Sequence, residues 1–395
     1  MSQMLNIRKK LFFVLGISFL LILVSCSTSH NMASYNTGTS TENTTAVPKQ
    51  IALLLPLSGP MAGPGQAVRD GFMNSYYQAL QSGQVTTKVR VYNTMQGDIE
   101  RLYEQAILDG ADCIVGPLEK EKVQRMARSP LPVTTIALNY IGKSYQGSTN
   151  LYQFGLSPLD EATQAAQFAY QRGQRSALII APTGPWGLGV VQAFRNQWRQ
   201  LGGQVNAQFF YAPNQDLSAY VRQVLQVNEK AEANAKLVRQ PMLVQSAGRR
   251  VENAPTPALR RQDVDMVFLV AQPPKARQIN PLLKFYYAGD LPVYSISLVY
   301  SGIPSPAADQ DLNGIMFDDM PWVFNPTASK LSHFPRLYAL GRDAFTVVMK
   351  RQEWKYSPST VIQGYTGELS LGSNNQIMRK LVWAQFDQGE VHTID

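Results

Sequence analysis

Residues 51–60 read Ile-Ala-Leu-Leu-Leu-Pro-Leu-Ser-Gly-Pro, an unbroken apolar run that ends in a turn signal. A run of this kind is typical of a parallel strand that is buried on both faces. A Gly-rich loop follows, and then Val68, Phe72, Tyr76 and Leu80 recur at helical spacing, which predicts a helix over 66–80. The stretch is therefore the first strand–helix unit of an α/β fold.

The same alternation continues along most of the 395 residues. Further strands are expected at 88–92, 112–115, 133–138, 176–181, 204–211, 264–270 and 293–296. Helices are expected at 98–110, 119–128, 160–171, 186–201, 216–227 and 275–287. Repeated βαβ units predict parallel sheets, and this many strands favours two doubly wound lobes with a ligand crevice at the carboxyl ends of the strands.

The N-terminus has the pattern of a secretory signal. Three basic residues, 8–10, precede the apolar run 11–24, which is shorter than the about 20 residues of a membrane-spanning helix. The run ends in Leu-Val-Ser-Cys at 23–26, which resembles a bacterial lipobox; the alternative is an ordinary signal peptide followed by an incidental cysteine. We expect residues 1–25 to be a signal peptide, Cys26 to be lipidated, and residues 26–49, rich in Ser and Thr, to be a flexible tether.

The formal net charge of +8 does not indicate a nucleic-acid partner. Three basic residues belong to the signal segment, and residues 228–261 hold seven basic residues against three acidic ones. The excess is therefore local. Four arginines of this insertion are the candidate partner contact: Arg249, Arg250, Arg260 and Arg261. The alternative, which the sequence supports at least as well, is that the insertion is a solvated loop.

The residues give little support for catalysis, a metal or a cofactor. The chain has three histidines and two cysteines, without HExxH, paired CxxC or GxSxG. His333 is expected at a helix start and Cys113 in the core. Asp318 and Asp319 are adjacent on an extended segment, so their carboxylates should point to opposite faces and make a poor acid–base pair. No enzyme is expected.

Candidate cleft residues lie at the predicted strand ends or in the loops after them. They are Ser58, Gly59, Gly116, Leu118, Asn139, Trp186 and Gln272. The loop Gly59–Gly65 could offer backbone amides to a ligand, although a structural turn is the simpler interpretation. The set contains no Arg or Asp that would clamp the charged groups of an amino acid, which weighs against an amino-acid receptor.

Several segments in fixed order resemble the LppC/LpoA lipoprotein family. They are 51–60, 66–72, 112–118, 151–158, 186–203, 263–294, 319–322, 337–341 and 383–386, so the resemblance covers about residues 50–395. It implies a fold like the type I periplasmic binding proteins, with lobe 1 at about 50–155 and 290–365 and lobe 2 at about 156–289 and 366–395.

The resemblance also implies a function. A lipoprotein of this family is expected to sit on the periplasmic face of the outer membrane of a Gram-negative bacterium, consistent with Ser27 after the lipidated cysteine. It would bind and activate a class A penicillin-binding protein and so regulate peptidoglycan synthesis. The enterobacterial activator carries a long helical domain ahead of this module, where this chain has a tether that spans about 80 Å at most. The alternative function is a receptor for an uptake system, with an unidentified small ligand in the cleft.

Overall fold

The computed structural model describes residues 47–142, 145, 147–233 and 258–394. The chain divides into two units, Met1–Thr44 and Thr45–Asp395, and every described residue lies in the second. The expected signal peptide, Cys26, Arg249 and Arg250 lie outside the described residues. Among the described helices, none has the length and apolar character needed to cross a bilayer.

The first sheet has five parallel strands in the order β2-β1-β3-β4-β5. They are β1 (Gln50–Leu55), β2 (Lys88–Asn93), β3 (Cys113–Val115), β4 (Thr134–Ala137) and β5 (Leu151–Gln153). Strand β1 is buried on both faces: Leu53 packs on one side and Leu54 on the other, as its unbroken apolar sequence predicts.

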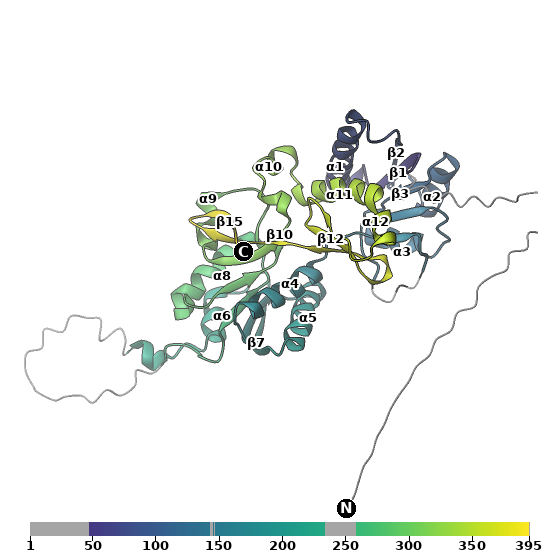
Figure 1. The fold of residues 1–395 in the computed structure, drawn as a ribbon. Helices are drawn as coiled ribbons and strands as arrows, with labels where there is room; N and C mark the ends of the chain where they lie inside the picture. The colour runs from purple at the N-terminus through teal and green to yellow at the C-terminus, as the bar shows by residue number, and fades with distance from the viewer. Residues whose placement is uncertain (1–46, 143–144, 146, 234–257, 395) are drawn as a thin grey trace, which may run out of the picture. The chain divides into compact units, whose positions relative to one another are not determined.

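Four helices cover this sheet (Figure 1). The helices α2 (Ile99–Leu108) and α3 (Lys120–Met126) contribute to the core on one face. The helices α1 (Ala62–Gln81) and α11 (Pro335–Lys350) contribute to the core on the other. A small antiparallel sheet of β11 (Ile362–Gln363), β12 (Glu368–Leu371) and β13 (Ile377–Lys380) shares the core of α1 and α11.

The helices α1 and α11 cross at backbone distance. A Cβ atom added to Gly71 would lie 1.9 Å from the carbonyl oxygen of Tyr338, and one added to Gly341 would lie 2.0 Å from that of Val68. Each helix therefore presents a glycine to the backbone of the other, and this permits the close approach.

The second sheet has seven strands in the order β15-β14-β10-β9-β8-β6-β7. They are β6 (Ser176–Pro182), β7 (Gln204–Tyr211), β8 (Met266–Leu269), β9 (Val293–Ser295), β10 (Ile315–Asp319), β14 (Val382–Asp387) and β15 (Glu390–Ile394). Strands β6 to β10 are parallel, and β14 and β15 add antiparallel strands at one edge. One face packs on α4 (Pro158–Gln171) and α5 (Pro185–Gln200), the other on α6 (Leu217–Val224) and α8 (Pro273–Leu283).

Residues 229–233 are helical as well, and further short helices connect the elements above. They are η1 (Gly59–Met61), η2 (Lys284–Ala288), η3 (Ser297–Val299), α9 (Pro306–Asp309), η4 (Gln310–Leu312), η5 (Pro321–Phe324), α10 (Ala328–Leu331), α12 (Gln352–Tyr356) and η6 (Ser373–Asn375).

The sheets correct the lobe boundaries expected from the sequence. Strands β9 and β10 lie in the seven-stranded sheet, so residues 290–319 do not belong to lobe 1. Strands β12 and β13 share the core of the five-stranded sheet, so residues 366–380 do not belong to lobe 2. We define the first lobe as 47–153 and 335–380, and the second as 158–319 and 382–394.

The chain passes between the lobes at three segments, which we call the crossovers. They are residues 154–157, residues 320–334 and Leu381. Three crossovers link two doubly wound lobes, so neither lobe is a continuous piece of the sequence.

Candidate functional site

The first lobe holds an apolar cavity of about 280 Å³ at the carboxyl ends of its strands. Its lining comes from the start of α1, the loops after β3 and β4, the crossovers and α11: Met61, Pro64, Leu118, Leu138, Asn139, Leu156, Phe334, Leu337 and Leu340. The lining contains no charged side chain and one amide. The position is that of the crevice predicted for a doubly wound sheet.

The amide of Asn139 is occupied by the protein itself. Its Nδ2 donates to the carbonyl oxygen of Leu118 at 3.0 Å, and its Oδ1 accepts from the amide nitrogen of Tyr140 at 2.9 Å. The side chain therefore ties together the loops after β3 and β4. Phe334 lies against the first turn of α1, where a Cβ on Gly63 would come within 2.9 Å of its ring.

Two of the seven predicted cleft residues, Leu118 and Asn139, line this cavity. Ser58 Oγ instead accepts a hydrogen bond from Asn93 Nδ2 at 3.0 Å. Gly116 has a structural role, because its φ is +105° and a Cβ would lie 2.1 Å from the carbonyl oxygen of Leu54.

The remaining predicted cleft residues also lie outside the cavity lining. Gly59 has a φ of +70° and makes the turn before α1. Trp186 is 45% exposed at the start of α5, and Gln272 is exposed before α8.

Arg260 and Arg261, two of the four arginines expected as a partner contact, form ion pairs within the second lobe. The guanidinium of Arg260 is buried; it pairs with both carboxylate oxygens of Asp290 at 2.7–2.8 Å and donates to the carbonyl oxygen of Tyr287. Arg261 pairs with Asp263 at 2.7 Å. Both arginines lie in the segment that leads into β8, and their hydrogen bonds join this segment to other parts of the second lobe.

A set of buried charged side chains lies beside the crossovers, and we call it the crossover cluster. It comprises Glu161, Asp318, Asp319, Arg336 and Arg379. Arg336 is half-buried, and the other four side chains are buried. The guanidinium of Arg336 binds both oxygens of Asp319 and donates to the carbonyl oxygens of Ser297 and Tyr300.

Two carboxyl groups of the crossover cluster have shifted pKa values. Burial is the main cause that raises the pKa of Glu161 to about 7, although Ser297 donates to its Oε2 through Oγ at 2.8 Å. Burial, followed by the charge of Glu161, raises the pKa of Asp318 well above its ordinary value. No pattern in the sequence indicates that the charge of Glu161 acts on two aspartates more than 150 residues later in the chain.

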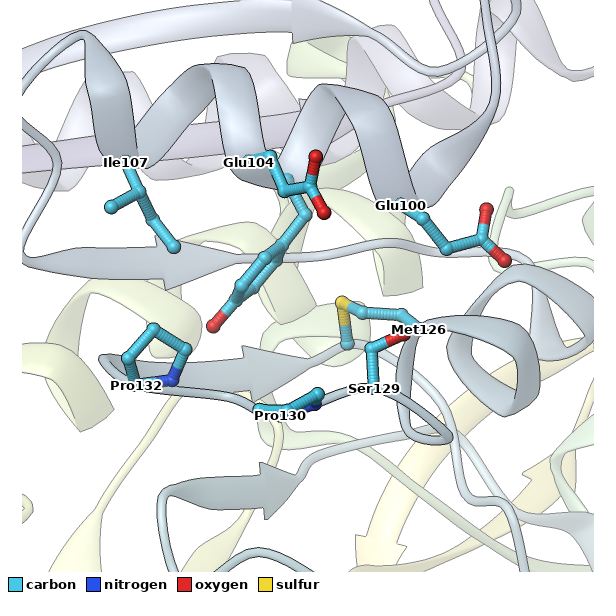
Figure 2. A pocket seen from close by; sticks show the side chains of 8 residues that line it. Glu100, Glu104, Ile107, Met126, Ser129, Pro130 and Pro132 are labelled. Carbon is cyan, nitrogen blue, oxygen red and sulfur yellow. The ribbon is translucent and has the colours of Figure 1, made fainter.

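A second groove, of about 240 Å³, lies on the outer side of the first lobe between α2 and residues 126–132 (Figure 2). Tyr103 forms part of its wall and shares a hydrogen bond of 2.9 Å with Thr135 Oγ1. Glu100 is held by Arg125 at 2.7 Å, and Glu104 is the other acidic side chain that Figure 2 shows at this groove. The groove contains no histidine, cysteine or lysine that would complete an acid–base or nucleophile pair.

Within the described ranges, no group of three or more His, Cys, Asp or Glu side chains could hold a metal ion. His333 is exposed just before α11, as its sequence context predicts, and Cys113 is fully buried in β3. The arrangement offers binding surfaces and a buried charged cluster, without a recognisable catalytic constellation in this part of the chain.

Comparisons with known proteins agree with the resemblance. The family model described as "LppC putative lipoprotein" matches residues 40–389. A penicillin-binding protein activator LpoA from Photobacterium profundum is 27% identical over 349 residues, which cover 85% of this chain and 55% of that protein. The counterpart from Erwinia tasmaniensis is 31% identical over 323 residues, covering 78% and 48%. The chain thus spans about half the length of the curated relatives it matches.

Solved structures confirm the fold. The C-domain of LpoA from Haemophilus influenzae, described as a regulator of PBP1A, superimposes with a TM-score of 0.68 at 25% identity, covering 88% of this chain and all of that domain. An ABC transporter substrate-binding protein from Sphaerobacter thermophilus gives a TM-score of 0.59 at 15% identity, covering 87% and 96%. The expected α/β fold, like that of type I periplasmic binding proteins, is confirmed.

Proposed function

Because the chain belongs to the LppC family of lipoproteins, we propose that it is a non-enzymatic activator of a class A penicillin-binding protein. In this role it regulates peptidoglycan synthesis from the outer membrane. Activation requires that the protein bind the active conformation of the synthase more tightly than the inactive one.

The observation that carries the proposal is the extent of the structural match. The described module superimposes on the whole of an LpoA C-domain, so the likeness concerns a complete folded unit and not a shared motif. The relatives that share 27–31% identity with this chain are named penicillin-binding protein activators. The function is therefore assigned to the two-lobed module that both kinds of comparison cover.

The cavity of the first lobe supports a role other than amino-acid uptake. A receptor for amino acids needs groups that neutralise an ammonium and a carboxylate, and the lining of the cavity carries no charged side chain. The one amide in the lining, that of Asn139, is hydrogen-bonded to backbone atoms of the same lobe.

The proposal is tested with the purified lipoprotein and purified class A synthases in detergent. We expect the immobilised lipoprotein to retain one class A synthase and to raise the fraction of cross-linked muropeptides that this synthase makes from lipid-linked precursor. An amino-acid-binding receptor of the same fold is the matched control and should do neither. Absence of both retention and stimulation for every class A synthase of the cell would refute the proposal.

The anchoring step is proposed separately and rests on the lipobox. We propose that Cys26 is lipidated and that the protein is retained on the periplasmic face of the outer membrane, as Ser27 suggests. Cells fed labelled palmitate should label the parent chain and not the Cys26→Ser variant. The parent should sediment with outer-membrane fractions on a density gradient, and sedimentation with inner-membrane fractions would contradict the placement.

A further inference from the structure

The crossover cluster brings together residues that adjoin all three crossovers. Glu161 lies in the first turn of α4, directly after the first crossover. Asp318 and Asp319 end β10, directly before the second crossover, and Arg336 begins α11 after it. Arg379 lies in β13, two residues before the third crossover.

We propose that Glu161 and Asp318 form a proton-binding pair that determines the conformation of the crossovers. The segments that join the lobes keep one conformation when the pair carries a proton and become free to change it when the pair does not. The device is a pH-sensitive hinge, and it is independent of which partner the protein binds.

The charges of the cluster do not balance unless a proton is present. The groups that act on the pair come from every element around it: Asp319 from β10, Arg336 from α11, Arg379 from β13 and the Ser297 hydroxyl from η3. Within the crossover cluster, three carboxyl groups face two guanidinium groups, and Asp343 of α11 is a further carboxyl that acts on Arg379. A proton on one carboxyl of the cluster reduces this excess of negative charge, which matters because the interior solvates an unbalanced charge poorly.

Hydrogen bonding points to the carboxyls that share the proton. Asp319 has donors for its carboxylate, since it accepts from Arg336 and from the amide nitrogen of Met320 at 2.8 Å. Asp318 is 0% exposed, and neither of its carboxylate oxygens has a hydrogen-bond partner in the described protein. A wholly buried carboxylate without donors is unstable as an anion, so Asp318 is the favoured holder of a proton, with Glu161 next to it.

The third crossover is hydrogen-bonded to α4, the helix that contains Glu161. Gln164, one turn after Glu161 in α4, donates through Nε2 to the carbonyl oxygen of Arg379 at 3.0 Å. It also accepts through Oε1 from the amide nitrogen of Leu381 at 3.0 Å. A shift of α4 that relieves an ionised Glu161 would therefore strain the backbone at the third crossover and just before it.

The sign of the pH effect follows from the direction of the shifts. A carboxyl whose pKa is raised on folding stabilises the folded state fully below its ordinary pKa, and that contribution is lost as the pH rises through the raised value. For Glu161 the loss occurs between pH 4.5 and about 7. The two histidines in the described chain, His333 and His392, are exposed and do not belong to the crossover cluster.

The test compares the full-length lipoprotein in detergent at pH 5.5 and pH 8 with its Asp318→Asn and Glu161→Gln variants. We expect the melting temperature of the parent to fall by about 5 °C over this interval. The neutral amides cannot ionise, so each variant should lose at least half of this fall. Two variants are used so that one remains informative if the other does not fold.

A distance measurement reports on the hinge itself. Exposed positions on α1 and α5, Gln81 and Gln200, are replaced by spin-labelled cysteine in the parent and in both variants. The distribution of distances between the labels should change between pH 5.5 and pH 8 in the parent and should stay constant in the variants.

The matched control is Asp309→Asn, which removes another buried carboxylate of the second lobe. Asp309 is 2% exposed and pairs with Arg277 at 2.7 Å, so its carboxylate belongs to an ion pair outside the crossover cluster. This variant should melt lower at both pH values and keep the pH dependence of the parent. A parent whose melting temperature and label distances are the same at both pH values, or an Asp318→Asn and Glu161→Gln pair that keeps the full pH effect, would overturn the proposal.

Discussion

The thiol of Cys113 illustrates how one residue's surroundings decide its chemistry. Its side chain is 0% exposed in β3, and burial raises its pKa to about 12. A thiolate is the reactive form of cysteine, so this group should be inert in the folded protein.

We therefore expect native Cys113 to react with a maleimide or an aromatic disulfide at pH 8 at least 100-fold more slowly than in the unfolded chain. The measurement is the labelling rate followed by mass spectrometry across a urea titration, and the rate should rise with the unfolding transition. Rapid labelling without denaturant would show that β3 opens locally.

Asp318 and Asp319 show what a residue's neighbours in sequence can and cannot reveal. The expectation that their side chains point to opposite faces agrees with their different surroundings: Asp319 binds Arg336, whereas Asp318 is near Glu161. The prediction that they make a poor acid–base pair considered only their directions, whereas both faces of β10 are buried at this point. Alternation along a strand gives the direction of a side chain but not what covers it.

At the scale of elements, the crossing of α1 and α11 depends on two glycines. We expect Gly341→Ala to lower the free energy of unfolding by about 3 kcal/mol, because its Cβ would collide with the backbone of α1 and force the helices apart. Urea unfolding measures the change. Gly97→Ala is the control, since its Cβ would meet no atom nearer than 3.9 Å, and it should change the free energy by less than about 0.5 kcal/mol.

Two aspartates at helix starts allow a comparison of capping. Asp216 precedes α6 and its Oδ1 accepts from the amide nitrogens of Ser218 and Ala219. Asp98 occupies the same position before α2, but its side chain makes no capping hydrogen bond and lies 3.3 Å from Arg125 instead. We expect Asp216→Ala to cost about 1 kcal/mol of unfolding free energy and Asp98→Ala less than half of that, measured by urea unfolding. Equal losses would mean that the cap geometry is not what stabilises α6.

Strand–helix units with strong periodicity were predictable from the sequence, and those that depend on distant pairing were not. The expected strand at 176–181 is β6, and the expected helix at 186–201 is α5. Strands β9 and β10 were expected with the first lobe, but they pair with β8 and with each other. Which sheet a strand joins is decided by its neighbours across the sheet, and hydrophobic periodicity carries no information about them.

At the scale of the whole molecule, the cavity shows the same limit. Leu118 and Asn139 could be found because strand ends mark the crevice of a doubly wound sheet. Phe334, Leu337 and Leu340 could not, because α11 reaches the first lobe from nearly 180 residues beyond the last strand of its sheet. The resemblance did place residues 290–365, and with them the helix start expected near His333, in the first lobe, but it gave no reason to place this helix at the crevice.

The discontinuous first lobe gives a prediction about independent folding. Its core includes Leu340, Phe345 and Val348 from α11, and residues 47–156 alone lack all of them. We expect the fragment 47–156 to show no cooperative thermal transition by circular dichroism, and a fusion of 47–156 to 334–380 through a short Gly-Ser linker to regain one. The linker is feasible because Leu156 and Phe334 line the same cavity. A cooperative transition in the short fragment would contradict the dependence on α11.

The crossovers also bear on the order in which the protein can mature. A chain that is exported with its N-terminus first delivers α1 long before α11. The apolar side of α1 that includes Phe72 packs against α11 in the folded protein, so it stays exposed until α11 arrives. By then every strand of the second sheet except β14 and β15 has been exported. The last residues to arrive then complete the second sheet. Folding in the envelope must therefore finish both lobes nearly together, and the nascent first lobe is the intermediate most in need of protection from aggregation and proteolysis.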